Sequence, residues 1–224
     1  MMNKVKVKSY SFFAIFSVFV LFVYNRTFIS ALFTSEMSTQ SKFLSLLLVY
    51  STLYFLHSFF FAKKTYKFFV WFFCFLNCVA MYFMDTYHAL ISKDAIINLL
   101  ETNKNEAINF INLRLIVYFF LFFVLVLVFF TKIIYVEFSN FRKEAKYKFY
   151  SLIVFIFSVF VTLSSKNLFY EIRQNKFLGD YIVPINYVRN IYRVVKMKIY
   201  GKSSKEFNIT PTSLFIPTSS LFLA

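Results

Sequence analysis

Five long stretches without a charged side chain limit the solvents in which this sequence can fold. They cover residues 9–25, 43–62, 68–84, 115–131 and 149–165. A helix needs about 20 apolar residues to cross a bilayer, and about 17 is the lower limit. Each stretch meets that requirement, so the sequence predicts five transmembrane helices.

The alternatives to a helical membrane protein fail on chain length and on residue pattern. A chain of 224 residues, 59% of them hydrophobic, is too short to bury five such helices on all sides in a soluble core. A transmembrane β-barrel would show shorter segments in which apolar and polar residues alternate. Residues 115–130 read LIVYFFLFFVLVLVFF and are apolar on every face of a helix. The predicted fold class is therefore all-α, a polytopic membrane protein.

The first stretch follows three lysines, as the apolar part of a signal peptide would. It lacks a small-residue cleavage site and leads instead into VYNRTFISALF. It is therefore predicted to be a permanent span.

Lysine and arginine are distributed unevenly between the two sides of the membrane, and this sets the predicted orientation. The N-terminus and the second and fourth loops hold eleven of them: Lys4, Lys6, Lys8, Lys63, Lys64, Lys67, Lys132, Arg142, Lys143, Lys146 and Lys148. The first and third loops, although longer, hold five: Arg26, Lys42, Lys93, Lys104 and Arg114. Because positively charged short loops stay in the cytoplasm, the N-terminus is predicted to be cytoplasmic and the C-terminus to lie on the opposite side.

The net charge of +15 lies mostly in these flanking segments and in the tail after residue 165. Its expected partner is anionic membrane lipid, and no nucleic-acid partner is predicted. Cys74 and Cys78 lie in apolar surroundings that suppress the thiolate, so they are predicted to be packing residues. His57, in mid-span without an acidic residue, is predicted to be a hydrogen-bonded packing residue. His88 and its neighbouring aspartates lack a regular metal-ligand spacing, so no metal site is predicted.

The loop between the third and fourth spans, residues 85–114, carries a helical pattern. Ser92 or Asp94 can cap a helix start. Apolar residues then recur at helical spacing, namely Ile96, Leu100, Ala107, Ile108 and Ile111. The pattern predicts an amphipathic helix that lies on the outer leaflet.

Three polar residues of this loop, Asn98, Thr102 and Glu106, are spaced at i, i+4 and i+8. On a continuous helix they would fall within an arc of roughly 80° and span about 12 Å. The carboxylate could hold an ammonium group, and the amide and hydroxyl could donate to phosphate or glycerol oxygens. The same spacing also fits the solvated face of an ordinary surface helix. Residues 103–105, Asn-Lys-Asn, could break the helix and spoil the alignment.

Residues 166–200 after the fifth span predict a second amphipathic element. Pro184 suits a first helical turn. An apolar stripe follows it, formed by Ile185, Val188, Tyr192, Val195 and Ile199, while Arg189, Arg193 and Lys196 share another face. The helix can lie along the membrane interface with its arginines near lipid phosphates, or pack on the bundle as a surface helix, and the two are compatible. Residues 201–224 are predicted to be a disordered or aberrant tail, because the sequence has no charge from Phe207 onward.

The loop and the tail together resemble a known family. The run ISKDAIINLLETNKNEA, a span, a basic loop, a span and NLFYEIRQNKFLGDYIVPINYVRNIYRVVK are similar to the N-terminal membrane domain of the lipid A phosphoethanolamine transferases. These are inner-membrane enzymes of Gram-negative bacteria in the alkaline-phosphatase and sulfatase superfamily. The resemblance extends from about residue 10 to residue 200. It places residues 1–165 in a five-span membrane domain and residues 166–200 at the periplasmic face.

In that family an Asn-x3-Thr-x3-Glu motif in this loop contributes to binding phosphoethanolamine. The resemblance therefore implies substrate-binding roles for Asn98, Thr102 and Glu106. The similarity in the tail includes five residues for which a structural role is expected: Arg173, Asn175, Pro184, Asn186 and Tyr187.

The family enzymes continue into a periplasmic α/β domain with a threonine nucleophile in a Gly-Glu-Thr-x-Arg motif and with zinc ligands. There the threonine takes phosphoethanolamine from phosphatidylethanolamine and passes it to lipid A or a related acceptor. In this sequence Glu101 and Thr102 follow Leu100 rather than glycine, and there are two histidines in all. The resemblance thus implies no catalytic residue, no metal ligand and no cofactor in this chain, which is expected to be inactive alone.

Three hypotheses follow from these patterns. The first is the membrane portion of a phosphoethanolamine transferase, ended early by a frameshift, a stop codon or a fragmentary gene, as the abrupt change near residue 206 indicates. The second is a stand-alone lipid-binding or accessory inner-membrane protein without catalysis. The third, a small transporter or channel subunit, has no support from paired charges, broken helices or an inverted repeat.

Overall fold

The computed structural model describes residues 4–87, 90–103 and 111–200, which form a fold made almost entirely of helices. The N-terminal half contains β1 (Val5–Lys8), α1 (Ser9–Phe19), η1 (Val20–Tyr24), α2 (Arg26–Thr34), α3 (Thr39–Phe60), α4 (Tyr66–Tyr87) and α5 (Lys93–Glu101). The C-terminal half contains α7 (Leu113–Phe119), η2 (Phe120–Val124), α8 (Leu125–Val128), η3 (Phe129–Ile133), β2 (Ile134–Glu137), α9 (Phe141–Ser164), α10 (Lys166–Gln174), η4 (Lys176–Asp180) and α11 (Ile185–Tyr200). The all-α prediction is confirmed.

Four described helices are long and apolar enough to cross a membrane, which confirms a multi-pass membrane protein. They are α3, α4, the continuous helix Leu113–Ile133 and α9. A fifth span is present if the bent pair Ser9–Tyr24 and Arg26–Thr34, which meets at 65°, counts as one. The predicted first span coincides with the straight part of this pair.

The fifth predicted span is longer in the structure than in the sequence prediction. Helix α9 begins at Phe141 rather than at residue 149, so it includes basic residues that were predicted to lie in a loop. Lysine and arginine are good helix formers, so the charged sequence continues the helix while its side chains reach outward. Lys148 instead reaches across to α3, where its Nζ donates to the Phe59 carbonyl at 3.1 Å.

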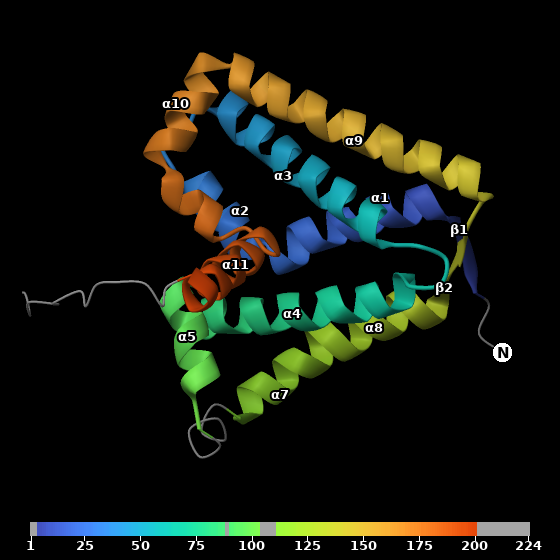
Figure 1. Cartoon of the computed structure of the whole chain (residues 1–224), viewed down its shortest axis with the longest axis horizontal. Coiled ribbons are helices and arrows are strands. Elements are labelled where there is room, and N and C mark those ends of the chain that lie inside the picture. The colour runs from blue at the N-terminus through green and yellow to red at the C-terminus, as the bar shows by residue number, and fades with distance from the viewer. Residues whose placement is uncertain (1–3, 88–89, 104–110, 201–224) are drawn as a thin grey trace, which may run out of the picture.

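The helices extend between two ends of the bundle (Figure 1). Helix α9 lies along α3, and α4 lies along α7 and α8. Strands β1 and β2 pair in parallel, with Val5 opposite Ile134 and Lys8 opposite Glu137. These strands mark one end, called the β1 end here. Segments α2, α5, α10, η4 and α11 gather at the other end, called the α11 end.

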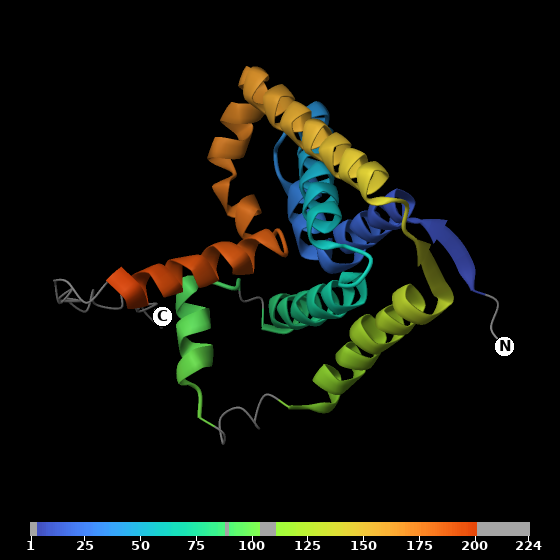
Figure 2. The same cartoon turned by 45° about the vertical axis from the view of Figure 1, so that its right-hand side comes forward.

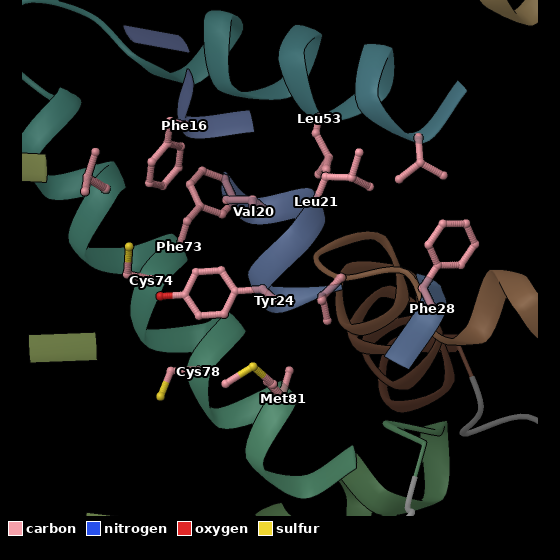
Figure 3. Close-up of a cluster of buried hydrophobic side chains, with 14 of the residues drawn as sticks. Phe16, Val20, Leu21, Tyr24, Phe28, Leu53, Phe73, Cys74, Cys78 and Met81 are labelled. Carbon is pink, nitrogen blue, oxygen red and sulfur yellow. The ribbon is translucent and has the colours of Figure 1, made fainter. Parts of the chain in front are cut away.

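The core of the bundle is built around the first helix (Figure 3). Phe16, Val20 and Tyr24 are fully buried, and the Tyr24 ring points toward α4 beside Cys74 and Cys78. Both cysteines are buried and free. The prediction that they are packing residues is confirmed.

His57 of α3 is also buried in this core. Its Nδ1 lies 2.8 Å from the Ser17 hydroxyl, and its ring contacts Phe16, Phe61 and Phe73. This confirms the prediction of a hydrogen-bonded packing histidine.

Candidate functional site

The loop helix α5 starts where the sequence predicted. Ser92 is its N-cap, and the Ser92 side chain accepts a hydrogen bond from the Ala95 backbone N–H at 3.1 Å. Asp94 lies in the first turn, where a carboxylate interacts favourably with the positive end of the helix dipole. Of the two predicted caps, the structure selects Ser92.

The sequence left open a continuous helix or a break near residues 103–105, and the structure has a break, because α5 ends at Glu101. Thr102 leaves the helical conformation, with φ −59° and ψ 126°. Its backbone N–H and its hydroxyl both donate to the Asn98 carbonyl, at 2.8 and 2.6 Å. Asn103 follows, and asparagine favours turns over helix because its side chain competes for backbone hydrogen bonds. Ile111 is exposed and lies outside any helix.

Two of the three predicted site residues lie within the described part of the chain. The Asn98 side chain is exposed on the last turn of α5, and Thr102 is half-buried directly after it. The structure therefore brings the Asn98 amide and the Thr102 hydroxyl to the same end of α5. Glu106 lies outside the described residues, as do Ala107, Ile108 and His88.

Two asparagines of α11, Asn186 and Asn190, fix the position of α5. The family resemblance had implied a structural role for Asn186, whereas Asn190 was not singled out from the sequence. Helix α11 lies against α5 (Figure 2). The Asn190 amide donates to the Ile91 carbonyl at 2.6 Å and to the Asn186 Oδ1 at 2.9 Å. Asn186 in turn donates to the Asp180 carbonyl. The i, i+4 spacing of Asn186 and Asn190 was the available signal, because it places two amides on one helical face.

Buried polar contacts also connect α11 to the spans. The Tyr187 hydroxyl donates to the Asn77 Oδ1 of α4 at 3.0 Å, and burial raises the pKa of Tyr187, which stays protonated as this donor. The side chain of Asn25, which lies at the break between η1 and α2, binds both backbone polar groups of Val183. Its Oδ1 accepts from the Val183 N–H at 2.7 Å, and its Nδ2 donates to the Val183 carbonyl at 2.9 Å.

An ion pair closes the base of the loop that carries α5. Arg26 donates to Asp85 through Nε at 2.9 Å and through a second nitrogen, and it also donates to the Tyr118 hydroxyl. Thr27 donates to the other Asp85 oxygen at 3.1 Å. These contacts join the start of α2 to the end of α4 and to α7, which are the two helices that flank the loop.

Helix α11 packs on the bundle through the face that carries Asn186 and Asn190, and its apolar stripe points outward. Val188 and Tyr192 of the predicted stripe are 55% and 64% exposed. The residues buried against the bundle are instead Tyr187, Asn190 and Val194. The helix therefore packs on the bundle, as one of the two alternatives predicted, and its apolar stripe stays exposed. A position along the membrane interface stays a prediction.

Zinc, which the family resemblance implies for a catalytic domain, does not fit the residues described here. Within residues 4–87, 90–103 and 111–200, no three His, Cys, Asp or Glu side chains group in a way that could hold a metal ion. His57 and the two cysteines lie in the core among aromatic rings, with no carboxylate beside them.

Comparison with known proteins decides the family. A family model described as phosphoethanolamine transferase EptA/EptB matches residues 48–199, more than half of the chain. The chain belongs to the EptA/EptB phosphoethanolamine transferase family. This match includes α5 and nearly all of α11, and so it covers Asn98, Thr102 and Glu106.

Two relatives of the EptA/EptB family agree with this assignment. The phosphoethanolamine transferase EptA of Helicobacter pylori is 32% identical over 149 residues, which cover 66% of this chain and 27% of the relative. The structure also resembles the integral membrane lipooligosaccharide phosphoethanolamine transferase A (EptA) of Neisseria meningitidis, with a TM-score of 0.75. That likeness, at 16% identity, covers 89% of this chain and 38% of the solved one, and it shows a shared fold. The chain thus spans well under half the length of each of these relatives.

Proposed function

We propose that this chain is the membrane part of a phosphoethanolamine transferase that uses phosphatidylethanolamine as donor and lipid A or a related envelope lipid as acceptor. The observation that carries the proposal is the family match over residues 48–199, which includes the exposed end of α5. Family membership favours this function over a stand-alone lipid-binding protein.

The proposed location is the bacterial inner membrane, with the N-terminus in the cytoplasm and the α11 end in the periplasm. The support is the charge distribution: Lys4, Lys6 and Lys8 precede or lie in β1, and Lys132, Arg142 and Lys143 flank β2. All of them belong to the β1 end. Positively charged segments of this kind stay in the cytoplasm.

In this proposal the end of α5 binds the donor headgroup. The exposed Asn98 amide donates to a phosphate oxygen. The Thr102 hydroxyl already gives its hydrogen to the Asn98 carbonyl, so its lone pairs are left to accept from the ethanolamine ammonium. Glu106 supplies the opposite charge for that ammonium. The headgroup is thus held by one donor and two acceptors.

The bond exchange at phosphorus is not assigned to these residues. The sequence contains no Gly-Glu-Thr-x-Arg segment, and no metal-binding group is present in the described part of the chain. Membrane anchorage and donor binding are the roles proposed here.

Binding of phosphatidylethanolamine to the purified chain in detergent micelles tests the headgroup site. Glu106→Gln is expected to weaken binding about tenfold, since a charge-assisted hydrogen bond is lost. Glu101→Gln is the matched control, because it removes an exposed carboxylate on the same loop outside the site. Equal affinities of the two variants would contradict the assignment.

A reporter fusion after Tyr200 tests the orientation separately. A reporter that is active only when it is exported is expected to be active. Activity of a cytosol-only reporter at the same position would overturn the proposed topology and place the α5 surface on the wrong side of the membrane.

A further inference from the structure

A cavity of about 460 Å³ lies at the α11 end, between α2, α3, α10, η4 and α11, and it is called the α3/α10 cavity here. Its volume falls within the range of about 300–1,000 Å³ that is typical of small-molecule sites. Leu48 and Val49 of α3 and Phe169 of α10 form part of an apolar wall. No residue of α5 lines it, so the cavity is separate from the Asn98 and Thr102 surface.

Two arginines line the same cavity. Arg189 of α11 pairs with Asp180 through one terminal nitrogen, while its Nε is buried without a partner among the described residues. Arg173 of α10 makes no hydrogen bond or ion pair to any described residue and is exposed. The described lining of the cavity thus contains two guanidinium groups and no carboxylate, and Asp180 pairs with only one of them, so the cavity keeps a net positive charge that suits an anion.

Ser45 adds an independent sign of a ligand. It lines the cavity and is 7% exposed, yet its hydroxyl has no hydrogen-bond partner among the described residues. Serines elsewhere on α3 satisfy themselves within the helix: Ser51 donates to the Leu48 carbonyl and Ser58 to the Phe55 carbonyl, both at 2.9 Å. A buried hydroxyl without a partner costs free energy, which a bound acceptor would recover.

The depth of the cavity matches the headgroup boundary of a bilayer. Ser45 follows Thr39, the first residue of α3, by six positions, so it lies about 9 Å along a helix of about 33 Å. This places the polar groups near one surface of a hydrocarbon layer of about 30 Å and the apolar wall beside its edge. A ligand that fits must therefore be anionic at one end and apolar at the other.

We propose that the α3/α10 cavity binds one glycerophospholipid. Its phosphate lies between Arg173 and Arg189, and the Ser45 hydroxyl donates to an ester carbonyl. One acyl chain packs against Leu48, Val49 and Phe169. This assignment rests on the cavity alone and does not require the proposed transferase function.

The test measures binding of phosphatidylglycerol to the full chain in detergent micelles. This lipid carries the phosphate but no ethanolamine, so it lacks the ammonium group that Thr102 and Glu106 bind in the proposed donor site. Arg173→Gln is expected to weaken its binding about tenfold through loss of a charge-assisted hydrogen bond. Lys166→Gln, which removes one positive charge from the same helix outside the cavity, is expected to leave binding unchanged. Arg173 is exposed and makes no hydrogen bond or ion pair to a described residue, so its variant should fold normally.

Two further experiments distinguish a bound lipid from a bound free anion. Leu48→Trp fills the apolar wall and is expected to reduce phosphatidylglycerol binding while the arginines remain. Inorganic phosphate and diacylglycerol, each of which carries only half of the proposed ligand, are expected not to displace phosphatidylglycerol at matched concentration. The proposal is overturned if Arg173→Gln behaves like Lys166→Gln. Displacement by either half-ligand as effectively as by unlabelled phosphatidylglycerol would overturn it too.

Discussion

The spans and the α11 end are held together by different kinds of contact. Helices α3 and α9 meet through two serine pairs, Ser51 with Ser158 and Ser58 with Ser151, each at 2.5 Å. Helix α4 meets the helix Leu113–Ile133 through rings such as Phe75 and Phe123, with centroids 5.7 Å apart. At the α11 end, asparagine side chains instead bind backbone groups that lie outside the regular helices or at their ends, such as those of Val183 and Ile91.

This difference indicates that the fold depends more on the asparagine contacts at the α11 end than on the serine pairs between the spans. Each of these four serines has a carbonyl of its own helix within hydrogen-bond distance, as Ser158 has that of Phe155. Each hydroxyl therefore has an alternative partner within its helix to the contact between the helices. In membranes such contacts contribute only about 0.6 kcal/mol on average. An asparagine that satisfies a buried backbone group has no substitute, and its loss leaves that group unpaired.

The largest effect is expected for Asn25→Ala. Asn25 is fully buried and makes three side-chain hydrogen bonds, to Val20 and to both backbone groups of Val183. Its removal should lower the free energy of unfolding by about 3 kcal/mol, because buried backbone groups lose their partners. Unfolding by SDS in mixed micelles measures this change.

Asn140→Ala is the control for Asn25, because Asn140 is exposed and its side chain does not cap α9. It should change the free energy of unfolding by less than about 0.5 kcal/mol. If the free energy of unfolding fell equally in the two variants, the asparagine side chains at the α11 end would not stabilise the fold more than an exposed asparagine does.

A smaller effect, about 2 kcal/mol, is expected for Asn190→Ala. This change removes the bonds to the Ile91 carbonyl and to Asn186, of which the first fixes the start of α5. Amide hydrogen exchange should therefore become faster in α5 than in α3. The exposed Asn167 of α10 provides the control substitution to alanine. Equal acceleration in both helices would contradict a local anchor.

Ser51→Ala should cost only about 0.6 kcal/mol, although its bond to Ser158 is short and buried. Ser158 keeps its bond to the Phe155 carbonyl, so no polar group is orphaned. The same SDS titration measures the effect, with the exposed Ser164→Ala as control. A loss as large as that of Asn25→Ala would remove the distinction between the two regions.

Asn98→Ala should have the smallest effect on stability, within about 0.5 kcal/mol, because its side chain is exposed and makes no hydrogen bond to a described residue. Under the proposed function the same variant weakens phosphatidylethanolamine binding severalfold. Stability and binding are measured on one preparation. A variant that loses stability and keeps binding would show that Asn98 belongs to the scaffold rather than to the site.

Hydropathy and local chemistry in the sequence correctly predicted the helical class, the multi-pass architecture and the cap of α5. The long apolar runs can only be satisfied as helices in hydrocarbon, and Ser92 fills the role of an N-cap whatever surrounds it. The apolar spacing continues beyond Glu101 and so did not locate the end of α5, whereas Asn-Lys-Asn at residues 103–105 indicated a break close to it.

Only the tertiary structure decided which faces meet. In water, an apolar stripe indicates the buried side of a helix, whereas beside lipid it can equally be the exposed side. Val188 and Tyr192 therefore point away from the bundle, and Asn186 and Asn190 point into it. The sequence by itself determined that this is a multi-pass membrane protein. The partners of its buried asparagines, and the cavity lined by Arg173 and Arg189, required segments that are distant in sequence to be brought together.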